Sequence, residues 1–288
     1  MTGMKNTLEK KMHRCNFCRN KISSIKVINY FNKFENGIFF KCLSCKIFIN
    51  NKITKKIYIS SKKNFNSYLE KNILYFLKSL FLYLYFLKLK KFLPNKENII
   101  LDFGSGSGEF SNIISKSKNI VFATDFTFNK SLYNKKVSFI KIENLFKNKN
   151  KKKFNVIFLR HVLEHIYDFN KLIPKLKFLL KNNGKIIIEI PNYHSFWRKV
   201  LKGKWPGFFY PYHHYVFSKQ FLIKKFKNHK LKIEKVNFVE PPIFGSYFSS
   251  LGIHRSLSKL LSIIFYPIQF MLSKFNSSSE GILFILKK

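Results

Sequence analysis

Arginine and acidic residues are scarce in this chain of 288 residues. Lys and Arg number 54 against 14 Asp and Glu, which gives a formal net charge of +40, but only Arg14, Arg19, Arg160, Arg198 and Arg255 are arginines. Because the planar guanidinium is the usual reader of phosphates and base edges, the charge does not by itself indicate a nucleic-acid surface. An excess of Lys alongside abundant Asn, Ile and 35 Phe is typical of an A/T-rich genome. A nucleic-acid surface and attraction to an anionic membrane remain as alternatives.

The sequence predicts neither a secretory leader nor a membrane-spanning segment. No apolar segment follows the charges of the N-terminal MTGMKNTLEKKMHRC. The apolar runs 73–87 and 260–272 contain Lys78 and Pro267, and both are shorter than the ~20 residues that a membrane span needs. We therefore expect a cytoplasmic protein in which these runs are helices packed on the main domain. Peripheral contact of residues 243–275 with the inner face of the membrane is the alternative.

Only four cysteines are present, and they form two C-x-x-C pairs, Cys15 with Cys18 and Cys42 with Cys45. Two such knuckles predict a closed tetrahedral thiolate site for zinc, and a reducing compartment disfavours disulfides. Four free buried thiols or a redox pair are the alternatives. We expect a structural zinc ion in a small β-rich, zinc-ribbon-like module over residues 10–60.

A regular alternation of apolar runs and helical stretches begins near residue 98. The runs predict strands, and continuous apolar strands separated by helices indicate a parallel sheet covered on both faces. We expect an α/β fold over residues 95–288, with a Rossmann-like, doubly wound, mostly parallel seven-stranded sheet. A helical connector (61–94) precedes it, and an aromatic loop (196–230) and an apolar helical insertion (243–275) elaborate it. The expected strands are 99–103, 120–124, 137–140, 155–159, 185–190, 230–239 and 281–288.

Three alternating glycines, Gly104, Gly106 and Gly108, follow the first of these strands in IILDFGSGSGEF. Glycine allows positive φ and close backbone approach, and the amide groups at the start of the next helix suit a nucleotide-like ligand. A dinucleotide fingerprint is not matched, because Glu109 stands where G-x-G-x-x-G needs its third glycine. Asp125 ends the next apolar run, where an ionised carboxylate can accept hydrogen bonds from ribose hydroxyls.

The D-x-G-x-G-x-G motif that begins at Asp102 resembles the first motif of class I S-adenosylmethionine-dependent methyltransferases. Residues 154–192 are similar to the ubiquinone-type and related small-molecule members, and residues 205–218 (WPGFFYPYHHYVFS) resemble a stretch of one bacterial subgroup. Four-cysteine modules like the one at the N-terminus occur on some bacterial sugar and natural-product methyltransferases.

The resemblance implies S-adenosylmethionine as the cofactor. Phe126 would lie near the adenine, and Glu143 would lie near the adenine amino group unless it is a plain surface acid. The implied cofactor-binding residues are Asp102, Gly104, Ser105, Gly106, Gly108, Asp125, Phe126, Glu143 and His161.

A second motif, from His161 through Glu164 to His165, matches the H-x-x-E-H of certain zinc proteases letter for letter. It directly follows an apolar strand, and a protease would leave the glycine loop unexplained, so we do not favour that interpretation. We predict instead that Glu164 and His165 border a substrate pocket at the carboxyl ends of the strands. His165 and His213 are candidate bases for a hydroxyl acceptor, because imidazole titrates near neutral pH. A purely structural histidine is the alternative.

We therefore expect a methyltransferase that acts on a small molecule, such as a sugar or a glycan or lipid precursor. One alternative is a methyltransferase of RNA or another nucleic acid that uses the zinc module and the lysines for binding. The scarcity of arginine and the lack of an N/D-P-P-Y/F motif argue against it. A non-enzymatic cofactor-binding scaffold is the other alternative, and the intact glycine loop and its acidic partners argue against that. The sequence does not predict the oligomeric state.

Overall fold

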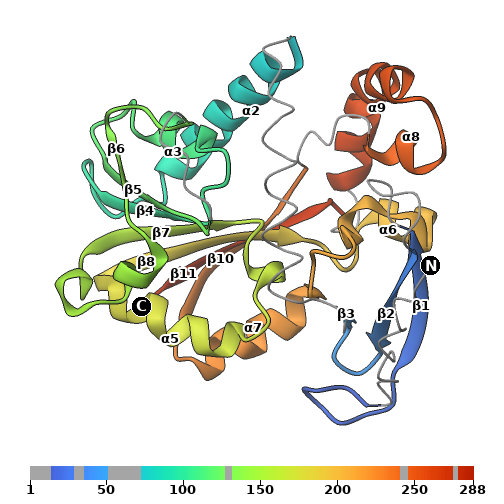
Figure 1. The fold of residues 1–288 in the computed structure, drawn as a ribbon, viewed down its shortest axis with the longest axis horizontal. Helices are drawn as coiled ribbons and strands as arrows, with labels where there is room; N and C mark the ends of the chain where they lie inside the picture. Colours follow the sequence, from blue (N-terminus) through green and yellow to red (C-terminus); the bar gives the residue numbers. More distant parts are fainter. Residues whose placement is uncertain (1–13, 29–35, 51–72, 127–131, 241–245, 275–277) are drawn as a thin grey trace, which may run out of the picture.

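The computed structural model describes residues 14–28, 36–50, 73–126, 132–240, 246–274 and 278–288, and its strands form two sheets (Figure 1). The main sheet has seven strands in the order β10-β11-β8-β7-β4-β5-β6. Its strands are β4 (Ile99–Phe103), β5 (Ile120–Thr124), β6 (Val137–Phe139), β7 (Phe154–Arg160), β8 (Leu180–Pro191), β10 (Lys232–Val239) and β11 (Gly281–Lys287).

The predicted Rossmann-like architecture is confirmed. β8, β7, β4, β5 and β6 pair in parallel, whereas β11 lies antiparallel between β8 and β10. The central strands are buried along almost their whole length, which explains why their sequences are continuously apolar. β8 begins at Leu180, earlier than the expected 185, because a register shift lets Leu180 pair with Phe154.

Helices cover both faces of this sheet (Figure 1). The helices α2 (Ile73–Lys90) and α3 (Glu109–Ile114) lie on one face, and Phe86 packs against Phe110 in the core beneath them. The opposite face carries α5 (Phe169–Leu179) and α7 (Lys219–Asn228). The shorter helical segments are α4 (Ile142–Leu145), α6 (Phe196–Leu201), and four 3₁₀ turns at Asn148–Asn150, Leu163–His165, Lys202–Lys204 and Pro206–Phe208.

The expected loop over 196–230 is therefore not irregular throughout, because its last part is helix α7. The Ser218 hydroxyl accepts a hydrogen bond from the Phe221 N–H at 3.3 Å and caps the helix, and Leu222 and Phe226 are buried. The many aromatic residues of this segment concealed the helical spacing.

The smaller sheet joins the N-terminal region to a distant part of the chain. β1 (Ser23–Ile28), β2 (Asn36–Cys42) and β3 (Ile47–Asn50) form an antiparallel meander, and β9 (Tyr215–Val216) adds to β3 as the fourth strand. Ile47 and Ile49 also belong to the apolar core under α5 and α7. The N-terminal module is thus continuous in packing with the main sheet. Residues 10–13, 29–35 and 51–60 of the predicted module and 61–72 of the predicted connector lie outside the described residues.

The apolar insertion forms two helices, α8 (Ser246–Ser250) and α9 (Arg255–Lys274), between β10 and β11. Val239 at the end of β10 pairs with Gly281, which pairs with Pro191 at the end of β8. The insertion therefore leaves the main sheet at the edge where the parallel strands end. Among the helices of the described residues, none has the length and apolar content needed to cross a membrane. Residues 243–245 and 275 of the predicted insertion lie outside the described residues.

Candidate functional site

The strand order reverses beside β4, since β5 and β6 lie on one side of it and β7 and β8 on the other. In open α/β sheets such a reversal opens a crevice at the carboxyl ends of the strands, and ligands bind there. Gly104 follows β4 directly, and His161 follows β7. The two sequence motifs singled out above therefore lie next to each other at this crevice.

The glycine loop turns through left-handed backbone at Gly104 (φ 76°), Gly106 (φ 57°) and Gly108 (φ 75°). A Cβ at Gly104 would collide with the side chain of Val162, so this glycine allows the loop to approach the segment after β7. A Cβ at Gly106 would meet no atom within 4 Å. The loop therefore borders open space at Gly106, as a ligand-binding loop would.

Asp125 lies beside this open space. Its Oδ2 atom accepts a hydrogen bond of 2.8 Å from the Gly106 N–H, and its side chain is 5% exposed. Phe126 is half exposed, and the hydroxyl of Ser105 is 2.8 Å from that of Tyr133. Glu143 lies exposed in the first turn of α4, after β6. The structure thus joins Gly106 to Asp125, while the roles predicted for Ser105, Phe126 and Glu143 stay predictions.

Asp102 is directed towards α3. It is buried and accepts a hydrogen bond of 2.6 Å from the Ser111 hydroxyl. Burial raises the pKa of the carboxyl to about 6, although Ser111 and Arg160 act to lower it. Asp102 thus fixes β4 to the helix behind the loop, and any role in cofactor binding would run through the shape of that loop.

Glu164, His165 and His213, the three predicted catalytic residues, come together at the same edge. Glu164 is fully buried, and its Oε1 lies 3.9 Å from His213 Nε2. The rings of His165 and His213 have centroids 4.6 Å apart. Neither carboxylate oxygen of Glu164 has a hydrogen-bond partner among the described residues. His161 Nδ1 is nearby, 3.4 Å from Glu164 Oε1.

Backbone carbonyls fix the orientation of both histidine rings. His165 Nδ1 lies 3.0 Å from the Tyr212 carbonyl, and His213 Nδ1 lies 2.9 Å from the Gly207 carbonyl. Because a carbonyl only accepts, each Nδ1 carries the proton and each Nε2 is an acceptor. Burial, and then the neighbouring His165, hold the pKa of His213 well below its usual range. His213 is therefore neutral at physiological pH.

The geometry of H-x-x-E-H does not suit a protease of that kind. Leu163–His165 is a single 3₁₀ turn, and His161 stands outside it with φ 51°. His161 and His165 therefore do not share a helix face, as two zinc-binding histidines of such proteases do. The second histidine whose ligand atom lies within 4.8 Å of those of Glu164 and His165 is His213, which is far away in the sequence.

A buried ion pair behind His161 was not anticipated from the sequence. Arg160 Nε donates to Glu189 Oε2 at 3.1 Å, and His161 Nε2 lies 3.5 Å from Glu189 Oε1. Burial favours the neutral acid, but Arg160 and His161 together hold the pKa of Glu189 well below its usual range. The sequence marks Glu189, because this acid interrupts the apolar run KIIIEI of a chain with few acids, but it does not mark Arg160 as the partner.

The N-terminal sheet holds the loop that carries His213. The amide nitrogen of Asn50 donates to the carbonyls of Pro211 (3.0 Å) and His213 (3.1 Å), and the Asn50 N–H donates to the His214 carbonyl at 2.8 Å. At the other end of the loop, Trp205 Nε1 donates to buried Glu280 at 2.8 Å. Asn50 is a positioning residue that the sequence did not reveal.

The four cysteines form a compact sulfur cluster, with all four Sγ atoms within 4.8 Å of one another. The Sγ atoms of Cys15 and Cys45 are 3.9 Å apart, and those of Cys18 and Cys42 are 3.5 Å apart. Tetrahedral zinc with Zn–S bonds of about 2.3 Å separates its sulfurs by about 3.8 Å. Backbone N–H groups also donate to two of the sulfurs, Phe17 to Cys15 and Cys45 to Cys42. This donor set fits a zinc ion.

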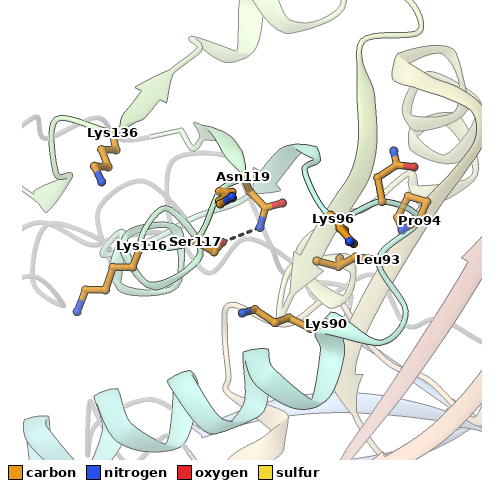
Figure 2. A pocket seen from close by; sticks show the side chains of 10 residues that line it. Lys90, Leu93, Pro94, Lys96, Lys116, Ser117, Asn119 and Lys136 are labelled. Carbon is orange, nitrogen blue, oxygen red and sulfur yellow. Dashed lines mark hydrogen bonds between the residues drawn. The ribbon is translucent and has the colours of Figure 1, made fainter.

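A hollow of about 870 Å³ lies at the opposite edge of the main sheet, near the amino ends of β4 and β5 (Figure 2). Lys90, Lys96, Lys116 and Lys136 are among its lining side chains. Figure 2 also shows Asn119 donating to the Ser117 hydroxyl, at 2.7 Å. The lining has neither a carboxylate nor a histidine, and the hollow is remote from the glycine loop. It is not a candidate for the reaction site.

Known sequences are similar to this chain. The sequence model of a family described as a methyltransferase domain matches residues 76–236. An uncharacterised protein of Methanocaldococcus jannaschii is 28% identical over 185 residues, which cover 62% of this chain and 78% of that protein.

Solved structures of low sequence identity are also similar to this chain. A SAM-dependent methyltransferase of Thermotoga maritima, described as a possible histamine N-methyltransferase, is similar with a TM-score of 0.51 at 16% identity, over 81% of this chain and 99% of that one. A SAM-dependent methyltransferase of Archaeoglobus fulgidus has a TM-score of 0.47 at 16% identity, over 75% of this chain and 100% of that one. The likeness to the Thermotoga protein supports the fold.

Proposed function

Since the chain belongs to the methyltransferase-domain family, we propose that it methylates a hydroxyl group of a small molecule, with S-adenosylmethionine as the methyl donor. A sugar or a glycan or lipid precursor is the acceptor class that we propose. The observation that carries the proposal is the open space at Gly106 beside the Asp125 carboxylate.

The residues around this space fit the cofactor. Gly106 offers backbone without a side chain, and the Asp125 carboxylate can accept hydrogen bonds from ribose hydroxyls. The half-exposed ring of Phe126 follows directly and can stack on the adenine. Bound here, S-adenosylmethionine supplies an electrophilic methyl group on a positively charged sulfur.

The histidine cluster lies where the acceptor would be held. A hydroxyl group must lose its proton as its oxygen takes up the methyl group, and a neutral imidazole can accept that proton. His165 and His213 both present Nε2 as an acceptor, in an arrangement fixed by the Tyr212 and Gly207 carbonyls. The ring of Phe209 packs against both histidines, with its centroid 6.3 Å from that of His165 and 5.3 Å from that of His213, and would help to exclude water from them. Positioning of the acceptor supplies most of the rate gain.

We also propose that the four cysteines hold one structural zinc ion. The sulfur spacing and the two N–H···S contacts support this assignment. The zinc site would stabilise the N-terminal sheet, and β3 and Asn50 would transmit that rigidity to the loop of His213.

The experiment that tests the function is calorimetry followed by a transfer assay. We expect the purified protein to bind S-adenosylmethionine and not NAD. It should then transfer radiolabelled methyl groups to a sugar or lipid fraction, with little dependence on salt. Tight NAD binding without S-adenosylmethionine binding would refute the proposal. Transfer to RNA that falls steeply with salt would instead support the nucleic-acid alternative.

A further inference from the structure

The buried carboxylate of Glu164 lacks a hydrogen-bond partner for either oxygen among the described residues. An ionised carboxylate in this setting is costly unless a cation compensates for it. The nearest charged or chargeable groups are His161 Nδ1 at 3.4 Å and His213 Nε2 at 3.9 Å. Both distances exceed a good hydrogen bond, and the 3.9 Å between Glu164 Oε1 and His213 Nε2 is close to the separation of two ligand atoms that each lie about 2.0–2.1 Å from one metal ion.

We propose that Glu164, His165 and His213 bind a divalent first-row transition-metal ion. Each residue offers one ligand atom, and these atoms lie within 4.8 Å of one another. Both histidines donate Nδ1–H to a backbone carbonyl, which is the arrangement that orients metal-binding histidines and directs Nε2 to the ion. Small side-chain rotations would bring the three atoms to bonding distance.

This ligand set of two imidazoles and one carboxylate differs from the cysteine cluster in ligand type and number. Three protein ligands leave open positions at the ion, whereas four thiolates close the coordination shell. Imidazole and carboxylate ligands suit Zn²⁺, Fe²⁺ and Mn²⁺. His161 is the competing cation, since its protonated ring would pair with Glu164 when no metal is bound. When the metal replaces His161 as the partner of Glu164, Glu189 would still hold the His161 ring, since its Oε1 lies 3.5 Å from His161 Nε2.

The role of the ion rests on the proposed function. An acceptor hydroxyl bound at an open position would have a lowered pKa, because the metal stabilises the alkoxide. The O–CH₃ bond would form as the S–CH₃ bond breaks, with release of S-adenosylhomocysteine and of one proton to water. With the ion bound, His165 and His213 would act as ligands, which replaces the role as bases that we propose for them in its absence.

Mn²⁺ binding, followed by electron paramagnetic resonance, tests the inference. The probe is Mn²⁺ alone, added to full-length protein that carries one zinc per chain and no excess. The four thiolates take that zinc in preference to the three-ligand site, and thiolates hold Mn²⁺ poorly. We expect about one Mn²⁺ per chain, and at least tenfold weaker binding in Glu164→Gln and in His165→Gln. The matched control His214→Gln, at the neighbouring histidine, should bind Mn²⁺ like the wild type. Circular dichroism checks the fold of each variant.

No Mn²⁺ binding, or unchanged binding in both ligand variants, would overturn the inference and leave His161 as the partner of Glu164. Calorimetry with S-adenosylmethionine on the same samples separates the two proposals. Cofactor binding without Mn²⁺ binding refutes only the metal site, and Mn²⁺ binding without cofactor binding refutes only the proposed function.

A different observation concerns α9, whose apolar side faces outward. Its exposed stripe is formed by Leu257, Leu260, Ile264, Ile268 and Met271, which are 49–62% exposed at helical spacing. The polar side chains of Ser258, Ser262 and Gln269 are buried instead, and Gln269 donates to Glu240. This is the reverse of a helix that covers a protein core. Helix α2 likewise exposes Phe76, Leu80 and Leu84.

We infer that the α9 stripe docks on an anionic lipid membrane. The helix carries three basic and no acidic residues, α2 has no acidic residue either, and the chain has a net charge of +40. That charge opposes pairing with a second copy and attracts anionic lipid. Figure 1 shows α2 and α9 projecting from the same side of the molecule. The insertion also leaves the sheet at the edge of the proposed site, which fits an acceptor presented by lipid.

Sedimentation with vesicles tests this docking. Vesicles rich in phosphatidylglycerol should bind the protein, and pure phosphatidylcholine vesicles should bind it at least tenfold more weakly. The double variant Leu260→Glu, Ile264→Glu should lose at least tenfold in affinity, and Leu43→Glu, an equally exposed change on the cysteine module, should not. The inference would be refuted if the wild type and both variants bound the phosphatidylglycerol vesicles equally, or if the wild type did not bind them. A dimer that the double variant dissolves would assign the stripe to a second copy.

Discussion

Replacing Asp125 by alanine should weaken S-adenosylmethionine binding about 10- to 150-fold, which corresponds to the ~1.5–3 kcal/mol of hydrogen bonds to a charged group. The change removes the carboxylate proposed for the ribose hydroxyls. It also removes the acceptor of the 2.8 Å bond from the Gly106 N–H, so the glycine loop is left with the bonds of Gly104 and Ser105 to the Thr124 carbonyl. Asp125→Asn keeps one acceptor oxygen, so its affinity for S-adenosylmethionine should lie between those of the wild type and of Asp125→Ala. Calorimetry on folded protein measures all three affinities.

Asp168→Ala is the matched control for that change. Asp168 is another of the chain's three aspartates, but it lies half-buried at the N-cap of α5, where it pairs with Lys171 at 2.8 Å. Its loss should leave the affinity for S-adenosylmethionine unchanged. If Asp125→Ala binds the cofactor as tightly as Asp168→Ala does, the cofactor does not lie at the glycine loop.

Replacing Cys42 by serine should have the largest effect on stability. Structural zinc contributes roughly 10–16 kcal/mol of apparent binding free energy in small zinc modules, and this is folding free energy for the segment that holds it. Cys42 is fully buried at the end of β2, so its loss should release the zinc and unfold the N-terminal sheet. Metal analysis and thermal unfolding followed by circular dichroism measure the two effects.

Leu43→Ser is the control, since Leu43 adjoins Cys42 and is 67% exposed. It should keep about one zinc per chain at the cysteine cluster. Full zinc retention in Cys42→Ser would contradict the assignment. We further expect Cys42→Ser to lower turnover more than cofactor affinity, because the N-terminal sheet holds the loop of His213 while the glycine loop belongs to the main sheet.

The sequence predicts where the strands and helices of this protein lie better than it predicts which segments pair with one another. The strands from Ile99 to Ile190 are continuous apolar runs between helices, so local pattern is enough to find them. The local pattern does not predict the pairing of β3 with β9, because β9 has only two residues. Asn50 carries no local signal either, because its partners Pro211 and His213 are far away in sequence.

The candidate site shows the same division. Gly106 and Asp125 could be paired from the sequence, because one follows each of two neighbouring parallel strands. Glu164 and His165 were also found together, since they are adjacent in a motif. The ion pair of Arg160 with Glu189 was missed, because it joins two strands through a register that only the assembled sheet defines.

The shared strand β9 also constrains how the chain folds. The cysteine pairs lie close in sequence and can bind metal as soon as residue 45 is made, but β3 finds its neighbour only when Tyr215 and Val216 follow. Until then β3 is an edge strand with Phe48 beside unpaired backbone, and such edges template aggregation. Non-local pairing of this kind is slow. Early metal binding would hold β3 in the meander with β2 until β9 is made, so zinc supply during synthesis should affect the yield of folded protein as well as its final stability.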